Sequence, residues 1–275
     1  MSLRMNRNRI INGNAVTILG KMPDNTVDLV VTSPPYDSLR SYHKNNQDKY
    51  NGYSFPFEAI AVELERVVKK GGVIVWVVAD AVVKGSESGS SFRQALYFMQ
   101  LGFRLHDTMI YEKNGVSFPA RRDGNRYTQI FDYMFVFSNG AKPKTANLII
   151  DKKNRWAGWQ YFGSVGSRRS QDGELVNRSH HTVAEVSARN NIWRINTGSG
   201  YSSSNPIAFE HPAIFPEELV EGHIQTWSEP SDLVIDCFSG SGTVPVVCKR
   251  LDRRYIGIEI SKKYCEIARR RLEDE

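Results

Sequence analysis

Apolar runs separated by polar and glycine-rich breaks divide the chain into alternating strands and helices. The run Val27–Thr32 predicts a buried strand, which the following prolines must end because proline cannot donate to a β-ladder. Over residues 56–70 apolar side chains recur at helical spacing, and Gly71-Gly72 is expected to stop that helix before a buried strand at residues 73–78. These elements predict one β-α-β unit.

The same alternation continues to the end of the chain. A helix at residues 91–101 with strands at 103–112 and 133–138 predicts a second unit. Pro216 opens a further helix with acidic residues in its first turn. The closing elements are a strand at 232–237, a helix from about residue 244, a strand at 255–260 and an amphipathic helix from Ser261. Near-continuous apolar strands between helices predict a mostly parallel sheet covered on both faces.

Composition narrows the class of protein. A chain of 275 residues with 40% hydrophobic and 24% charged residues can form one large α/β domain, or one domain with an insertion. The three cysteines form no CxxC pair, which indicates a reducing compartment and buried thiols rather than disulfides or a zinc framework. The longest apolar run, residues 72–79, is far shorter than the roughly 20 residues that a membrane span needs, so we expect a soluble, cytoplasmic protein.

Residues 141–205 interrupt the pattern with Gly, Ser, Asn and Arg, and we interpret them as an insertion. Between residues 141 and 194 there are ten basic and four acidic residues, an excess equal to the net charge of +6 of the whole chain. Trp156, Trp159 and Tyr161 lie among them, a combination typical of nucleic-acid contacts, although a solvated flexible loop would share it. The candidate contact residues are Arg155, Arg168, Arg169 and Arg178.

A glycine-rich loop from Asp236 to Thr243 joins the predicted strand and helix near the C-terminus. Such a loop lets the backbone approach a ligand, and the free N–H groups at the helix start favour an anion. Pro245 occupies the position of the third glycine in a dinucleotide fingerprint, which argues against NAD. Glu259, at the end of the next strand, stands where an acid would hold ribose hydroxyls. The alternative is a tight β-α turn without a ligand.

The sequence Ser33-Pro34-Pro35-Tyr36 follows the first predicted strand. The exocyclic amino group of cytosine or adenine is a poor nucleophile, and fixed hydrogen-bond acceptors can draw it toward tetrahedral geometry. The Ser33 hydroxyl and the Pro34 carbonyl can both accept from such a group, and proline rigidity fixes their aim. Tyr36 offers a face on which a base rotated out of a duplex could stack. By itself, the motif could also be a turn that ends a strand.

Taken together and in this order, the motifs resemble the amino-methyltransferases of bacterial and phage DNA modification. The resemblance is to members in which S/D-P-P-Y/F/W comes first, then a target-recognition region, then the F-x-G-x-G motif, here Phe238 to Gly242. It implies a Rossmann-like, doubly wound class I methyltransferase fold that binds S-adenosylmethionine. It also implies three parts, with residues 1–140 catalytic, 141–205 for target recognition and 206–275 for the cofactor.

The resemblance further implies which residues contact S-adenosylmethionine. The methionine side is assigned to the glycine loop, Glu259 to the ribose, and the stretch around Phe215 to the rest of the pocket. Asn14 stands where many relatives have Asp against the cofactor adenine, so that contact departs from the family pattern. The predicted cofactor residues are Asn14, Phe215, Asp236, Phe238, Gly240, Gly242, Thr243 and Glu259.

The activity implied by the resemblance is methyl transfer to the exocyclic amino group of a base in double-stranded DNA. Serine before Pro-Pro favours cytosine N(4), and adenine N(6) is the alternative. A catalytically silent DNA-binding relative and an enzyme acting on RNA or protein are more remote. No Pro-Cys dipeptide, P-loop or HExxH motif occurs, and we expect no metal. A cognate restriction endonuclease and a homodimer are candidate partners, and the expected location is the cytoplasm of a bacterium, at the nucleoid when bound to DNA.

Overall fold

The computed structural model describes residues 8–35, 56–115, 126–160, 167–177, 182–198 and 200–275. The chain forms two compact units, one of residues 1–147 with 191–275 and one of residues 148–190.

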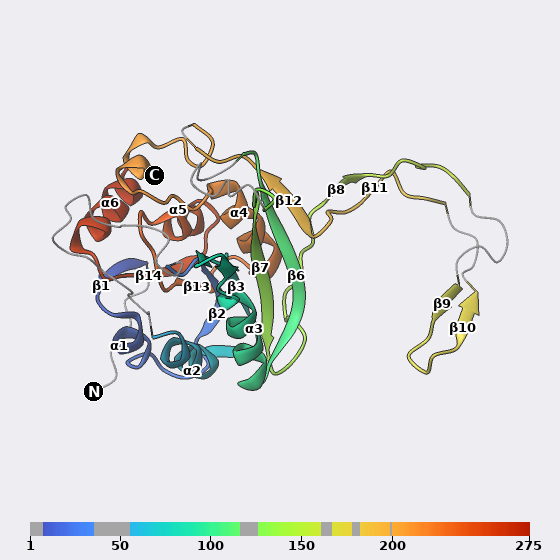
Figure 1. Cartoon of the computed structure of the whole chain (residues 1–275), viewed down its shortest axis with the longest axis horizontal. Coiled ribbons are helices and arrows are strands. Elements are labelled where there is room, and N and C mark those ends of the chain that lie inside the picture. Colours follow the sequence, from blue (N-terminus) through green and yellow to red (C-terminus); the bar gives the residue numbers. More distant parts are fainter. Residues whose placement is uncertain (1–7, 36–55, 116–125, 161–166, 178–181, 199) are drawn as a thin grey trace. The chain divides into compact units, whose positions relative to one another are not determined.

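An eight-stranded sheet forms the centre of the described part of the main unit, in the order β1-β14-β13-β2-β3-β7-β6-β12 (Figure 1). Neighbouring strands are parallel except at β7, which is antiparallel to both β3 and β6. The strands are β1 Arg9–Asn12, β2 Val27–Thr32, β3 Val68–Val78, β6 Phe103–Lys113, β7 Phe131–Asn139, β12 Ile192–Ile195, β13 Leu233–Asp236 and β14 Arg254–Glu259. A short antiparallel pair, β4 Val82–Val83 with β5 Ser86–Glu87, follows β3.

Helices cover both faces of this sheet (Figure 1). One face carries α1 Ala15–Leu19, α2 Phe57–Val67 and α3 Ser90–Gln100, and the other carries α4 Glu217–Trp227, α5 Thr243–Arg250 and α6 Lys262–Glu273. A 3-10 helix, η2 Pro206–Glu210, precedes α4. Because both faces are covered, every residue of β2 is buried. The predicted α/β fold is therefore confirmed for this unit.

Aromatic side chains form the part of the core between α2, α3 and the sheet. Phe98 makes edge contacts with Phe57, Trp76 and Phe103, with ring centroids 5.2 to 5.5 Å apart. The indole nitrogen of Trp76 has a hydrogen-bond partner inside the core, because its Nε1 donates to Gln94 Oε1 at 2.8 Å. Burial of each such side chain contributes roughly 1.5–3 kcal/mol to the stability of the fold. The apolar pattern in the sequence therefore determines how α2 and α3 pack on the sheet.

The prediction that Gly71-Gly72 stops the helix of residues 56–70 is wrong. Helix α2 ends at Val67, and β3 begins at the next residue and includes both glycines. The pairing of β2 with β3 is irregular here, since Val27 pairs with Val68 but Leu29 pairs with Val73. A Cβ at Gly72 would lie only 2.8 Å from the carbonyl oxygen of Lys69. The glycines therefore allow a tight irregularity within the strand instead of ending the helix.

The described part of the smaller unit contains two ribbons of antiparallel strands. One pairs β8 Ile150–Lys153 with β11 Val186–Ala188, and the other pairs β9 Ser167–Arg169 with β10 Leu175–Asn177. An ion pair between Arg189 Nε and Asp151 Oδ2, at 3.0 Å, joins the two strands of the first ribbon at one end.

The compact unit of residues 148–190 is shorter than the predicted insertion of residues 141–205. The sequence pattern missed β12, which pairs with β6 at the edge of the main sheet. Trp193 of β12 is buried and stacks on His223, with ring centroids 4.6 Å apart. Residues after 190 therefore belong to the core of the main unit, because one short strand there completes the sheet.

Candidate active site at the switch point of the sheet

The two motif loops follow two neighbouring strands. β13 and β2 are adjacent and parallel, with Ile235 opposite Val30. From β13 the chain crosses over α5 to β14, and from β2 it crosses over α2 to β3, on opposite sides of the pair. In doubly wound sheets, ligands bind at the carboxyl ends of strands where the order reverses in this way. The fold thus brings together motifs that are about 200 residues apart, at the place where a cofactor site is expected.

A buried hydrogen bond joins the two loops directly. Thr32 Oγ1 donates to Asp236 Oδ1 at 2.7 Å, and the backbone N–H of Phe238 donates to the same oxygen at 3.0 Å. Thr32 immediately precedes Ser33, and Phe238 begins the F-x-G-x-G motif. Burial raises the pKa of Asp236 to about 7, against the two hydrogen bonds, which favour the charged form. Asp236 therefore connects the two loops inside the protein, rather than offering an exposed contact to a ligand.

Glu259 lies at the end of β14 and accepts hydrogen bonds from two backbone N–H groups. Its Oε2 accepts from Gly240 at 2.9 Å and its Oε1 from Ser261 at 2.7 Å. Burial raises the pKa of this carboxyl, while its backbone donors lower it. A carboxylate offers about four lone-pair sites, so it can still accept from a ribose hydroxyl beside its backbone donors. Glu259 can therefore accept hydrogen bonds from the ribose hydroxyls of a nucleoside.

The two glycines of the loop have left-handed backbone conformations at positions where a side chain would crowd its neighbours. Gly240 has φ +50°, and a Cβ there would lie 3.1 Å from His211 Nε2. Gly242 has φ +79°, and a Cβ there would lie 2.6 Å from the Cβ of Ala268. Pro245 causes no conflict, because it lies in the first turn of α5, where its missing N–H has no intrahelical acceptor.

Some predicted cofactor residues are already engaged within the protein. Asn14 caps α1, and its Oδ1 accepts from the backbone N–H of Thr17 at 3.3 Å. The Thr243 hydroxyl accepts from Arg271 Nη1 at 3.1 Å, so its side chain faces the interior. Asn14 nevertheless stands beside the end of β14, because the N–H of Gly13 donates to the carbonyl of Glu259 at 2.9 Å.

The remaining predicted residues divide by burial. Pro34 is buried, whereas Ser33, Pro35, Phe215 and Phe238 are partly exposed. Tyr36 lies outside the described residues. Ser33, Phe215 and Phe238 therefore keep surface that a ligand could contact.

Sequence reasoning missed Thr32 and Arg271. A hydroxyl residue at the end of a buried strand, directly before Ser33, was the available signal for Thr32. For Arg271 the signal was an arginine on the apolar face of an amphipathic helix, one turn after Ala268.

Of the four arginines predicted to contact DNA, Arg155 is the one whose side chain the structure describes, and it lies in the smaller unit. Arg155 is exposed, and its guanidinium carbon lies 5.4 Å from the ring centroid of Trp156. Trp156 and Trp159 are more than half exposed and pack edge to face, with centroids 5.5 Å apart. Arg168 and Arg169 belong to β9, but their side chains, like all of Arg178, lie outside the described part.

The described ranges contain no group of three or more His, Cys, Asp or Glu residues placed to hold a metal ion. None of their helices has the length and the apolar character to cross a membrane. The three cysteines are buried free thiols, as expected.

A doubly wound sheet with a glycine loop and a strand-end acid at its switch point defines a Rossmann-like enzyme for a nucleoside cofactor. The family model described as DNA methylase matches residues 27–270, and this chain belongs to that family. The orphan methyltransferase M.BamHII of Bacillus amyloliquefaciens is 56% identical over 255 residues, covering 91% of this chain and 90% of the relative. The type II methyltransferase M.Cfr9I of Citrobacter freundii is 26% identical, covering 99% and 90%.

Solved structures agree on the fold. The PvuII DNA methyltransferase (cytosine-N4-specific) aligns with TM-score 0.68 and 21% identity, covering 96% of this chain and 85% of that chain. The M1.HpyAVI–SAM complex aligns with TM-score 0.62 and 21% identity, covering 96% and 98%. The protein is a DNA methyltransferase of the cytosine-N(4)/adenine-N(6) family, and its methyl donor is S-adenosylmethionine. The predicted family, fold class and cofactor are confirmed.

Proposed function

We propose that this protein methylates N(4) of cytosine at a specific site in double-stranded DNA. The observation that carries the proposal is the buried hydrogen bond between Thr32 and Asp236, which holds the Ser33-Pro34 acceptors beside the cofactor loop. Serine before Pro-Pro is, by family resemblance, associated more often with cytosine than with adenine. Adenine N(6) offers the same kind of amino group and is therefore the outcome that the experiment must distinguish.

The residues of this chain supply binding and orientation. Glu259 and the glycine loop hold S-adenosylmethionine, which supplies an electrophilic methyl group when bound. The Ser33 hydroxyl oxygen and the Pro34 carbonyl accept hydrogen bonds from the amino group of the target base and draw its nitrogen toward tetrahedral geometry. Tyr36 stacks on the base once it has been rotated out of the duplex. The proton that the amino group loses passes to solvent.

The smaller unit is proposed to contact the DNA, as part of the target-recognition region. Its support is the exposed pair Trp156 and Trp159 with Arg155 over one ring. Guanidinium groups and flat aromatic faces suit phosphates and bases. The relative M.BamHII is described as an orphan methyltransferase. Because this chain is similar to it, our proposal does not require a partner endonuclease.

The test is the identity of the methylated nucleoside. DNA from a methylation-free host would be treated with the full-length protein and S-adenosylmethionine, digested to nucleosides and analysed by mass spectrometry. We expect N(4)-methylcytosine, and sequencing of the same DNA would give the recognition site. N(6)-methyladenine alone would transfer the proposal to adenine. Methylation of a cytosine ring carbon would contradict the role given to Ser33 and Pro34, and no methylation of any DNA would favour a silent DNA-binding relative.

A further inference from the structure

The C-terminal helix α6 contacts the glycine loop along one stripe of its surface. Tyr264, Ala268 and Arg271 are spaced four and three residues apart, so they share a face, and all three are buried. The ring of Tyr264 packs edge-on against His211, with centroids 4.3 Å apart. Ala268 occupies the space that a Cβ on Gly242 would need. Ala268 thus packs directly against the loop, while Tyr264 packs against His211, which lies beside Gly240.

Arg271, the third member, binds the loop through hydrogen bonds. Its Nη1 donates to the carbonyl oxygen of Ser241 at 2.8 Å, to the Ser241 hydroxyl at 3.2 Å and to the Thr243 hydroxyl at 3.1 Å. Its Nη2 donates to Glu217 Oε1 at 2.7 Å and to the Ser203 hydroxyl at 3.3 Å. One guanidinium therefore joins the second half of the loop to the first residue of α4.

A buried charge in this position is costly. The Arg271 side chain is fully buried, and burial lowers its pKa while Glu217 opposes that shift. A buried ion pair is often no more stabilising than well-packed apolar side chains of similar volume. Packing of α6 alone thus gives no reason for an arginine here. The Ser241 carbonyl and the Thr243 hydroxyl do give one, since an apolar residue could satisfy neither.

We propose that Arg271 is a positioning residue for cofactor binding. It fixes the Ser241 carbonyl and the Thr243 hydroxyl toward α6, so that the loop from Gly240 to the first turn of α5 keeps the shape that faces Glu259. This inference rests on the proposed placement of S-adenosylmethionine at that loop. Arg271 itself lies behind the loop, where it acts through Ser241 and Thr243.

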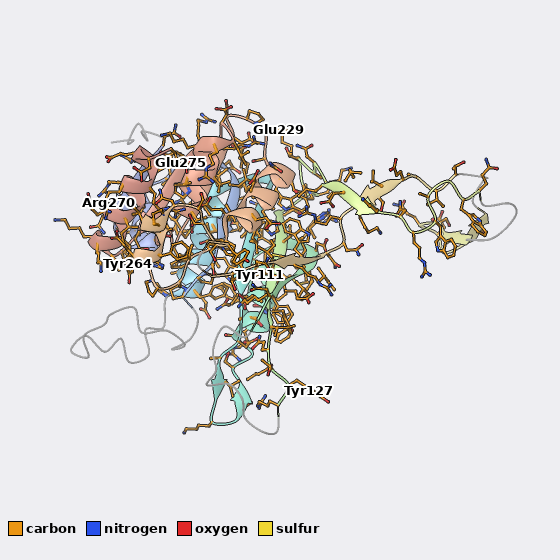
Figure 2. All side chains as sticks on the ribbon, turned by 90° about the horizontal axis from the view of Figure 1, so that it is seen from above. Tyr111, Tyr127, Glu229, Tyr264, Arg270 and Glu275 are labelled. Atoms are coloured by element: carbon orange, nitrogen blue, oxygen red, sulfur yellow. The ribbon has the colours of Figure 1, made fainter. Side chains whose placement is uncertain are left out.

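The first experiment compares Arg271→Met with Arg270→Met in the full-length protein. Arg270 is the neighbouring residue, projects from the surface of α6 (Figure 2) and pairs with the exposed Glu210. Calorimetry with S-adenosylhomocysteine should give a Kd at least about tenfold higher for Arg271→Met, and a change of less than about twofold for Arg270→Met. In methyl transfer, the KM for S-adenosylmethionine should rise while kcat at saturation stays within about twofold of the original enzyme.

A role in stability alone has a different signature. Arg271→Met would then lower the melting temperature, yet the folded protein would bind S-adenosylhomocysteine with unchanged Kd at low temperature. That result would overturn the proposal.

Two milder variants keep the test decisive if Arg271→Met does not fold. Arg271→Lys retains the charge but has one donor nitrogen in place of the two that bind Thr243 and Glu217, and Thr243→Val removes one acceptor at nearly constant volume. Each should raise the Kd about two- to fivefold. Thr226→Val is the matched control, because Thr226 is also buried and donates to the Gly222 carbonyl at 2.7 Å, away from the loop. Unchanged affinity in both milder variants would refute the role of Arg271.

Glu259→Ala, measured in parallel, separates this inference from the function on which it rests. If Glu259→Ala binds S-adenosylhomocysteine as tightly as the unmodified protein, the cofactor has been placed at the wrong site and both proposals fail. If only Glu259→Ala loses affinity, the site stands and the inference about Arg271 fails.

Discussion

The loops of the main unit and the ribbons of residues 148–190 present their candidate functional residues in opposite ways. In the main unit, Asp236 and Glu259 are buried and hydrogen-bonded to residues from other elements of the fold. In the smaller unit, Arg155, Trp156 and Trp159 are exposed, and the ring contacts of their side chains are with one another. The first arrangement suits chemistry, which needs fixed geometry, and the second suits contact with a large charged partner.

This contrast has energetic consequences. A preorganised polar group in a dry site can change a rate by orders of magnitude, because water cannot replace it. An exposed cation contributes a smaller amount that depends on salt, since counterions screen it. Substitutions in the two units should therefore differ both in the size of the effect and in the quantity that changes.

The largest effect is expected for Ser33→Ala. Removing this acceptor should lower kcat for methyl transfer by about a hundredfold or more, as loss of one preorganised partner does in other enzymes. The Kd for S-adenosylhomocysteine should stay within about twofold, since the interaction is made in the transition state. Single-turnover methylation assays measure the rate, and Ser86→Ala, an exposed serine of β5, serves as the control. A Ser33→Ala enzyme with full activity would remove the basis for the catalytic role of the loop.

Glu259→Ala should act on cofactor affinity instead. Loss of a charge-assisted contact costs about 1.5–3 kcal/mol, which corresponds to at least about tenfold in Kd for S-adenosylhomocysteine. Calorimetry is the measurement, and Glu266→Ala is a suitable control because Glu266 is an exposed carboxylate on α6. Since Glu259 also holds the N–H of Gly240, melting temperatures should be recorded for both variants. Equal affinities for the two variants would contradict the ribose assignment.

Charge reversal in the smaller unit should change DNA binding and leave the cofactor site intact. Arg168→Glu combined with Arg169→Glu should weaken DNA binding and reduce the slope of log K against log salt by about one to two, since each phosphate contact releases roughly one counterion. Arg155→Glu should have a smaller effect in the same direction.

Arg194→Glu is the control that tests the comparison itself. Arg194 lies within the basic stretch of the sequence, but the structure places it in β12 of the main unit, paired with Glu112 at 2.8 Å. We expect its reversal to alter the salt slope less than the change at Arg168 and Arg169 does. If all three positions contribute equally, the contacts belong to the basic stretch as a whole and the division into units has no functional meaning.

The smallest effect expected is a dependence of stability on pH that arises from Asp236. Its folded pKa of about 7 lies above the ordinary value of 3.8, so folding favours the protonated form. The stabilisation that the folded protein gains from this raised pKa is fully present below about pH 4. It is lost as the pH rises through 7. Asp236→Asn, which is neutral throughout, should therefore melt a few degrees higher than the unmodified protein at pH 8, and this difference should shrink toward pH 5. Calorimetric melting without cofactor measures it, and a difference that grows at low pH would show that Asp236 is ionised in the folded state.

The sequence by itself determined the order of the main elements and the two motif loops. Periodicity located α3, β13 and α6 to within a residue or two, because burial of one face or of a whole strand leaves a regular apolar pattern. The chemistry of Ser33-Pro34 and of Glu259 could be proposed from residue types alone, since few side chains can accept hydrogen bonds at the end of a buried strand. The pattern failed at Gly71-Gly72, where glycine serves a strand irregularity rather than a helix end.

Tertiary structure decided which residues meet. The contact between Thr32 and Asp236 depends on β2 and β13 being neighbours, and the contacts of Arg271 depend on α6 packing behind the loop. Only the sheet could show that residues 192–195 leave the basic stretch to become β12. Local propensity acts over a few residues, whereas these contacts join segments separated by about 30 to 200 residues, and their geometry follows from strand order and helix packing.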